Sequence, residues 1–275
     1  MKTGLSLKIL PALVALAIAP ATVSANGGFF ELPEQINMVA LGVGQAPDYS
    51  GSDDYETAVA PFGRYYFSGD RYVQLLGPQL TVNLLDDDNW QFGPELLYRF
   101  GRDDDVDDRI VKQMDEIDDT TMLGAFVTYS IKGTDNPLKR LIFSADLVAD
   151  VDDTNDGIYG TAMVKYWFPV GSGPAPILLN IGGGISFADD DYNNTYYGVN
   201  GANDIGLFGS SYTADGGVSS ARVLFGGVMP LSKSWIVGGG ARYEALLGDA
   251  KDSPVVDDRG DSSQWIYGAS LGYTW

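Results

Sequence analysis

The 275-residue chain contains no cysteine and no histidine. Without cysteine there are no disulfides and no thiolate chemistry. Without histidine no imidazole can act as a general base, bind a metal or complete a serine–histidine triad. A two-carboxylate hydrolase is the remaining enzymatic reading, but paired acids such as Asp53 and Asp54 lie in turn-like polar stretches. We therefore expect no enzyme activity, no cofactor and no metal site.

A long apolar run is also missing beyond the first 25 residues. Lys2 and Lys8 precede the apolar stretch 9–19, and small residues follow at Val23-Ser24-Ala25. This pattern is typical of a cleaved signal peptide over residues 1–25. A retained N-terminal anchor is the alternative, but the run is shorter than the ~20 residues that a membrane-spanning helix needs. The mature chain would be residues 26–275, and any membrane crossing there would have to use strands.

Positive charge is scarce, with 17 Lys and Arg against 37 Asp and Glu and a formal net charge of −20. Removal of Lys2 and Lys8 with the signal would make the mature chain still more acidic. Such a surface repels nucleic acid and bare anionic membranes, so we expect no nucleic-acid partner.

The dominant pattern is an alternation of apolar with small or polar residues. Eleven segments show it: 36–44, 57–67, 72–84, 90–100, 123–131, 141–149, 158–168, 177–187, 221–229, 234–247 and 265–275. They run ~9–13 residues, close to the ~9–11 of a tilted membrane-spanning strand and longer than the ~5–6 of a soluble sandwich. Aromatic residues gather near their ends, as in the interfacial girdles of membrane barrels. The sequence therefore predicts an all-β, antiparallel transmembrane β-barrel of the outer membrane.

The connections alternate between long and short. The long ones, 102–119, 151–156, 188–213 and 248–262, fall on one side, and the short ones, 85–88, 132–138, 169–174 and 230–233, fall on the other. Long outer loops and short periplasmic turns are the habit of outer-membrane barrels. Because single-chain bacterial barrels have an even number of strands, we expect about twelve strands, with ten possible. Either an extra strand forms near Phe29–Gln35 or one candidate does not span.

The polar face of these segments carries charges of both signs. A charge facing lipid at mid-bilayer costs ~2–4 kcal/mol, so these side chains are expected to point into the lumen. An internal salt-bridge network is favoured over a pore selectivity ring, because barrels of ~8–12 strands are mostly filled by side chains. The candidate residues are Arg64, Glu95, Arg99, Asp146, Lys165, Arg222, Arg242 and Glu244.

Clusters of aspartate raise the question of calcium. Asp152–Gly157 looks like the start of an EF-hand loop, but Thr154 and Met163 occupy positions three and twelve, where carboxylates are required. The stretch "RDDDVDD" at 102–108 offers weak divalent binding near lipopolysaccharide phosphates. A solvated acidic loop is favoured over calcium binding at both places.

The chain ends in "QWIYGASLGYTW", with Trp265, Tyr267, Leu271, Tyr273 and Trp275 on one face. Termini are usually polar and frayed, so an aromatic last residue suggests a barrel-closing strand. We expect Trp265 and Trp275 to lie near opposite interfaces. Tyr273 and Trp275 are the candidate signal for outer-membrane assembly.

Several stretches resemble the MltA-interacting protein (MipA)/OmpV family of outer-membrane proteins. They are "GVGQAPDYSGSDDYETAVAPFGRYYF" (42–67), "FGPELLYRFGRDDDVDD" (92–108), "GGGISFADDDYNNTYYGV" (182–199) and the terminal "YGASLGYTW". The resemblance implies a monomeric barrel in the Gram-negative outer membrane, in contact with its lipid and lipopolysaccharide. It also implies a scaffold for a periplasmic murein transglycosylase and a murein synthase. A narrow pore for small solutes and surface adhesion through the acidic loops are the alternatives.

Overall fold

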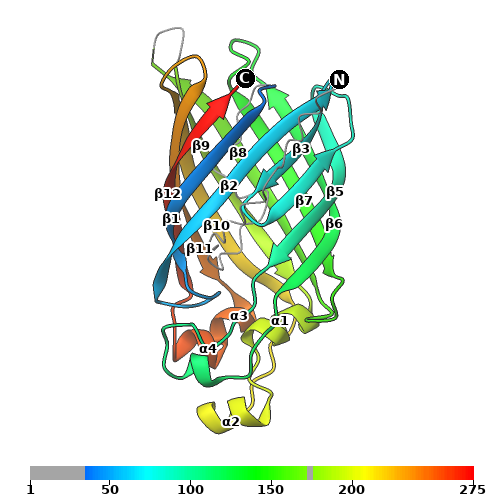
Figure 1. Cartoon of the computed structure of the whole chain (residues 1–275). Helices are drawn as coiled ribbons and strands as arrows, with labels where there is room; N and C mark the ends of the chain where they lie inside the picture. The colour runs from blue at the N-terminus through cyan, green and yellow to red at the C-terminus, as the bar shows by residue number, and fades with distance from the viewer. Residues whose placement is uncertain (1–34, 172–175) are drawn as a thin grey trace, which may run out of the picture.

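The structure is a computed structural model that describes residues 35–171 and 176–275. Twelve antiparallel strands close into one barrel, each hydrogen-bonded to its neighbours in chain order (Figure 1). The strands are β1 Met38–Pro47, β2 Tyr55–Ser68, β3 Arg71–Leu76, β4 Gln79–Asn83, β5 Trp90–Arg99, β6 Thr120–Lys132, β7 Arg140–Asp150, β8 Ile158–Val170, β9 Ile177–Ala188, β10 Gly217–Pro230, β11 Trp235–Leu246 and β12 Ser263–Thr274. The all-β barrel and the count of about twelve are confirmed.

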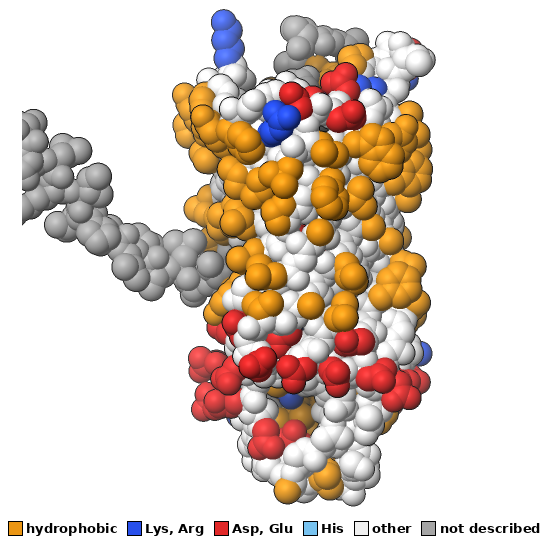
Figure 2. Space-filling model, turned by 90° about the vertical axis from the view of Figure 1, so that its right-hand side faces the viewer, with side chains coloured by type: hydrophobic (Ala, Val, Ile, Leu, Met, Phe, Trp, Pro, Cys, Tyr) orange, Lys and Arg blue, Asp and Glu red, His pale blue; other side chains and the backbone are white. Residues whose placement is uncertain are grey.

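The period-two alternation of the sequence separates side chains on the outer surface of the barrel from side chains in its lumen. On β12, Trp265, Tyr267 and Leu271 are exposed, whereas Gln264 and Thr274 are buried. The exposed apolar side chains of all strands together form a belt around the wall (Figure 2). A soluble monomer rarely exposes so much contiguous apolar surface, but lipid covers such a belt in a membrane barrel.

The barrel closes where β12 pairs with β1. The register runs from Met38 opposite Thr274 to Gln45 opposite Tyr267. The backbone N–H of Trp275 donates to the carbonyl of Asn37 at 3.2 Å, so the last residue extends the seam beyond the strand. The Tyr273 ring lies 6.3 Å from that of Trp275 and 5.3 Å from that of Trp235, centroid to centroid.

The segment 72–84 is a hairpin, so its prediction as one strand is wrong. It turns at Gly77, whose φ of +53° lies in the left-handed region that suits glycine. Pro78 follows, and a Gly-Pro pair marks a turn in the sequence. β3 and β4 supply the even count among the described strands. Of the alternative extra strand at Phe29–Gln35, residues 29–34 lie outside the described residues, and Gln35 is not in a strand. The predicted signal peptide, residues 1–25, also lies outside the described residues.

The two rims of the barrel differ. One rim, here called the short-turn rim, carries the ends of the described chain and the connections 69–70, 84–89, 133–139 and 231–234. Within the described residues, the long-loop rim carries four α-helices: α1 Asp190–Tyr197, α2 Ala202–Phe208, α3 Gly248–Asp252 and α4 Pro254–Asp257 (Figure 1). A short 3-10 helix at Val111–Gln113 lies in the connection between β5 and β6. In the part of the chain that the structure describes, no helix is long and apolar enough to cross a membrane.

Candidate functional site

The long-loop rim is covered by residues 48–54, 100–119, 189–216 and 247–262, here called the lid. Its helix α1 is capped by the preceding residue, Asp189, whose side chain accepts a hydrogen bond from the Tyr192 backbone N–H at 3.0 Å. This is the usual N-terminal cap. The helix presents Tyr192, Tyr196 and Tyr197 on one face, and all three are buried. They pack with barrel side chains such as Leu97 and Met122 in an apolar cluster at the mouth of the lumen.

Arg99 lies directly beneath α1. Its guanidinium stands 3.7 Å from the centroid of the Tyr196 ring and 4.8 Å from that of Tyr192. Tyr192 stacks in turn on Tyr159 of the barrel wall, with centroids 5.0 Å apart. Such contacts with ring faces stabilise a desolvated cation by ~2 kcal/mol each. Arg99 thus joins the lid to the barrel through aromatic rings.

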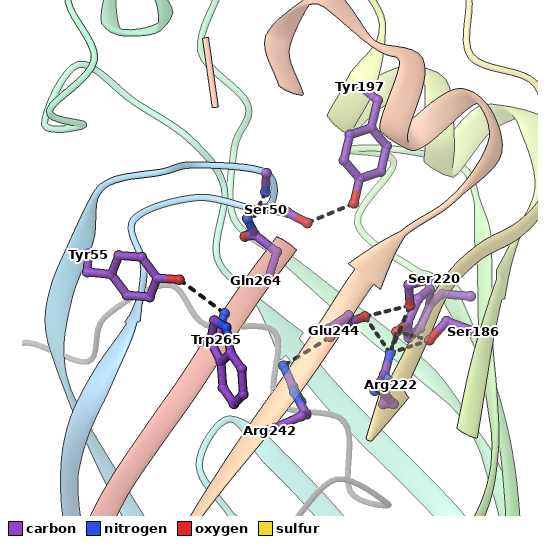
Figure 3. Close-up of polar contacts among 12 residues, drawn as sticks. Ser50, Tyr55, Ser186, Tyr197, Ser220, Arg222, Arg242, Glu244, Gln264 and Trp265 are labelled. Atoms are coloured by element: carbon purple, nitrogen blue, oxygen red, sulfur yellow. Dashed lines mark hydrogen bonds and ion pairs between the residues drawn. The ribbon is translucent and has the colours of Figure 1, made fainter. Parts of the chain in front are cut away.

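A cluster of charged side chains spans strands β10 and β11 (Figure 3). Glu244 Oε1 lies 2.9 Å from Arg222 Nη2, and its Oε2 lies 3.3 Å from Arg242 Nη2. Ser220 Oγ donates to the same carboxylate at 2.5 Å. Arg222 also donates to the Tyr159 hydroxyl at 2.9 Å and so reaches β8. One carboxylate therefore serves two buried arginines.

The remaining predicted charges lie deeper in the lumen. Glu95 accepts a hydrogen bond from Gln79, and Asp146 accepts one from Thr161. Lys165 is buried on β8. Toward the short-turn rim, Arg64 donates to Gln74 Oε1 at 2.7 Å and stacks over Tyr72 at 4.8 Å.

The structure thus places all eight predicted side chains inside the barrel but divides them. Arg222, Arg242 and Glu244 come together, whereas Arg64 and Arg99 lie apart from them against tyrosine rings. The α1 tyrosines are not among the residues predicted from the sequence. Their i, i+4, i+5 spacing in "DDYNNTYY" is the signal that marks one helix face.

Polar contacts join the lid segments to one another and tie the lid to the barrel. The Ser50 and Tyr197 hydroxyls lie 2.7 Å apart, and Ser253 Oγ donates to the Tyr197 carbonyl at 2.6 Å. The Gly51 N–H donates to Gln264 Oε1 at 3.1 Å, which joins the lid to β12 (Figure 3). Burial raises the pKa of the Tyr197 phenol to about 12, so the phenol stays protonated at neutral pH.

A second apolar cluster holds the lid segments to one another. It contains Tyr49, Val106, Val111, Met114, Val199 and Val255. Beside it, Arg259 forms two hydrogen bonds to Asp108, of which Nε to Oδ1 measures 3.2 Å. The lid is therefore a packed cover that joins four separate loops.

The side chain of Asp150 holds the loop at 151–157 by hydrogen bonds to the backbone of the loop. Asp150 accepts hydrogen bonds from the N–H groups of Asn155, Asp156 and Asp152 at 2.7, 3.0 and 3.2 Å. Asp153 and Asp156 adopt positive φ, which aspartate tolerates in turns. Within residues 35–171 and 176–275, no group of three or more carboxylates is placed to hold a metal ion.

Comparison with known proteins identifies a matching family and related outer-membrane proteins. The model of the family described as MltA-interacting protein MipA matches residues 39–275. Outer membrane protein OmpV of Vibrio cholerae is 32% identical over 124 residues, which cover 45% of this chain and 45% of that protein. Outer membrane protein Omp26La of Vibrio anguillarum is 26% identical over 174 residues, which cover 56% of this chain and 64% of that protein. Both matches span less than two thirds of the relative.

Among solved structures, the in-vitro folded outer membrane protein OmpT of Vibrio cholerae resembles this chain with a TM-score of 0.39 at 11% identity. The likeness covers 79% of this chain and 64% of that one. A bacterial polysaccharide outer membrane secretin gives 0.41 at 9% identity and covers 87% of this chain and 98% of that one. These likenesses are too distant to carry an argument about function.

Proposed function

This chain belongs to the family of the MltA-interacting protein MipA, and on that premise we propose that it is a scaffold for murein-remodelling enzymes. It is a β-barrel of the outer membrane, as its relatives are named. The family name implies binding of a murein enzyme, MltA. In this proposal the barrel is a monomer that holds a lytic transglycosylase, together with a murein synthase, and catalyses no reaction itself.

The closed long-loop rim is the observation that carries this proposal. The lid packs α1 into the mouth of the lumen, and Arg99 and Arg222 are engaged there by tyrosine rings and by Glu244. A barrel whose lumen is filled at the mouth in this way is better suited to binding other proteins than to the passage of solutes. A pore for small solutes is therefore the less favoured function.

The short-turn rim is the surface that a murein enzyme would meet, because short turns face the periplasm in outer-membrane barrels. The β4–β5 turn presents Asp86 and Asp88 there, paired with Arg71 at 3.5 Å and Lys132 at 3.3 Å. Asp87 fixes the turn by accepting hydrogen bonds from the backbone N–H groups of Trp90 and Asn89. These bonds lower the pKa of the Asp87 carboxyl, so the turn stays anionic through the physiological range.

Capture of a purified lytic transglycosylase by the detergent-solubilised barrel tests the proposal. The double variant Asp86→Asn and Asp88→Asn should lose capture, since it removes two exposed charges without disturbing Asp87. The matched control is Asp257→Asn and Asp258→Asn, which makes the same charge change on the lid. Equal capture by both variants, or none by the unaltered protein, would reject a scaffold acting through these turns.

A further inference from the structure

The barrel wall has a notch near the long-loop rim. The β3–β4 hairpin turns back at Gly77, whose N–H donates to the Pro61 carbonyl of β2 at 2.8 Å. Beyond that point β2 continues to Tyr55, paired with β1 on one edge. Within the described residues, no strand pairs with the other edge over 55–60. On the far side of the notch, β5 pairs with β4, and the last hydrogen bond between them runs from the Tyr98 N–H to the Pro78 carbonyl at 2.9 Å.

The open edge of β2 offers backbone groups to a further strand. In an antiparallel strand, alternate residues direct N–H and C=O to the same neighbour. Because Pro61 directs its carbonyl toward β3, Thr57 and Val59 direct theirs into the notch. Unpaired strand edges template pairing with another chain, and natural proteins usually cover them.

A cavity of about 670 Å³ lies between the two sides of this notch. β2 contributes Thr57 to its lining, and the β5–β6 connection contributes Phe100 and Gly101. Its charged lining is strongly acidic, with Asp48, Glu56, Asp103, Asp105, Glu116, Asp118 and Asp119 against one arginine, Arg102. The belt of acidic side chains at this level is visible below the apolar belt in Figure 2.

Two lining residues carry buried polar atoms without partners in the described part of the chain. Arg102 is only 8% exposed, and its Nε–H has no acceptor, although its Nη1 reaches the Tyr196 carbonyl at 3.5 Å. Glu56 has a buried Oε1 that accepts no hydrogen bond. Buried polar groups without partners are uncommon in native structures and call for an explanation. A ligand that carries both donors and acceptors, as a peptide backbone does, would satisfy both atoms.

We propose that this notch binds an extended basic peptide segment of a partner protein, which adds a strand to the open edge of β2. The backbone of the segment pairs with Thr57 and Val59, in the manner of β-strand addition. Its Lys or Arg side chains enter the acidic cavity. The phosphates of lipopolysaccharide are repelled by the same carboxylates, and the carboxylates are not arranged to chelate a metal ion.

Binding of a fluorescent nine-residue peptide of alternating lysine and valine, capped at both ends, tests the proposal on the full chain in nanodiscs. The variant Glu56→Gln, Glu116→Gln, Asp118→Asn removes three acidic groups from the lining and should weaken binding about tenfold, if each group contributes within the range of exposed ion pairs. The matched control, Asp252→Asn, Asp257→Asn, Asp258→Asn, removes three lid charges outside the cavity and should change affinity less than about twofold. Equal losses in the two variants would overturn the proposal.

Two further probes separate strand addition from simple charge attraction. A peptide with N-methylated backbone at alternate residues keeps its charge but cannot donate to β2, so it should bind at least about tenfold more weakly. The cysteine-free sequence allows Thr57→Cys to form a disulfide with a peptide that carries a central cysteine, whereas Ser262→Cys on the same rim should not. Unchanged binding of the N-methylated peptide, or equal trapping at both positions, would show that the edge takes no part.

Discussion

Among single residues, Glu244 has the most consequential position, because two buried arginines share its carboxylate. The variant Glu244→Gln keeps the shape but removes the negative charge that Arg222 and Arg242 share. Breaking a buried ion pair on one side costs about 3–5 kcal/mol, so we expect a loss of folding stability of that size. Urea unfolding in detergent, followed by tryptophan fluorescence, measures it.

Ser220→Ala is the control for this effect. It removes one neutral donor to the same carboxylate and should cost about 1 kcal/mol. Equal unfolding midpoints for Glu244→Gln and the unaltered protein would show that the lumen arginines do not depend on Glu244.

The Asp108–Arg259 pair makes the lid sensitive to acid. Burial opposes ionisation of Asp108, but the hydrogen bond from Arg259 and those from the N–H groups of Val111 and Ile110 outweigh it and lower the pKa of this carboxyl. Because the pKa is lower in the folded lid, ionised Asp108 stabilises the folded lid fully at pH values above the ordinary pKa of 3.8. This stabilisation is lost as the pH falls through the lowered pKa. We expect protease cleavage within 102–119 to be slow at neutral pH and to accelerate only at strongly acid pH.

In Arg259→Gln the main partner of Asp108 is gone. Cleavage of 102–119 by a protease that is active from neutral to acid pH should then be faster at neutral pH. The acceleration of cleavage by acid should begin at a higher pH than in the unaltered protein. An unchanged pH profile would contradict a role for this pair in holding the lid.

At the level of elements, strand β12 closes the barrel and Trp275 completes its seam with β1. Deletion of Trp275 removes the bond to Asn37 and the ring beside Tyr273. We expect the deletion to lower the amount of heat-modifiable folded barrel in outer-membrane fractions. Trp275→Phe keeps the terminal aromatic ring and the backbone bond and should assemble normally. Wild-type levels of the deletion variant would refute the proposed assembly signal.

Helix α1 is the element that fills the mouth of the lumen. We expect the unaltered protein to show little steady conductance in planar bilayers. The variant Tyr192→Ala, Tyr196→Ala removes two buried rings and the cover over Arg99, so it should conduct more often and with some preference for anions. Tyr65→Ala, on the lipid face, should leave conductance unchanged. Large stable channels in the unaltered protein would contradict the closed mouth.

The alternating strands are the elements that the sequence predicts best, because a lipid-facing side and a lumen side impose period two on every residue. The segment 72–84 reads as one strand because each arm of the hairpin alternates by itself. The buried positions are 72, 74 and 76 in β3 but 79, 81 and 83 in β4, and this change of phase at Gly77–Pro78 is the signal of the turn. The lid was missed for a different reason. Helix α1 has only eight residues, and its fold depends on contacts between loops that are far apart in the sequence, such as Ser50 with Tyr197.

On the scale of the whole molecule, the two rims of the barrel differ in build. The long-loop rim is covered by the lid and carries the acidic notch, while the short-turn rim presents compact charged turns. The lumen charges fall into local groups, of which the Glu244 group is the most complete. This arrangement favours a rigid platform for other proteins over a passage for solutes.

Site-specific photo-cross-linking in living cells tests the platform most directly. A photoreactive amino acid at Asp88, exposed on the β4–β5 turn, is predicted to cross-link a lytic transglycosylase, whereas the same amino acid at Asp258 on the lid is not. Equal cross-linking at the two positions, or no transglycosylase adduct at Asp88 or at Lys233 in the β10–β11 turn, would contradict a scaffold acting from the short-turn rim.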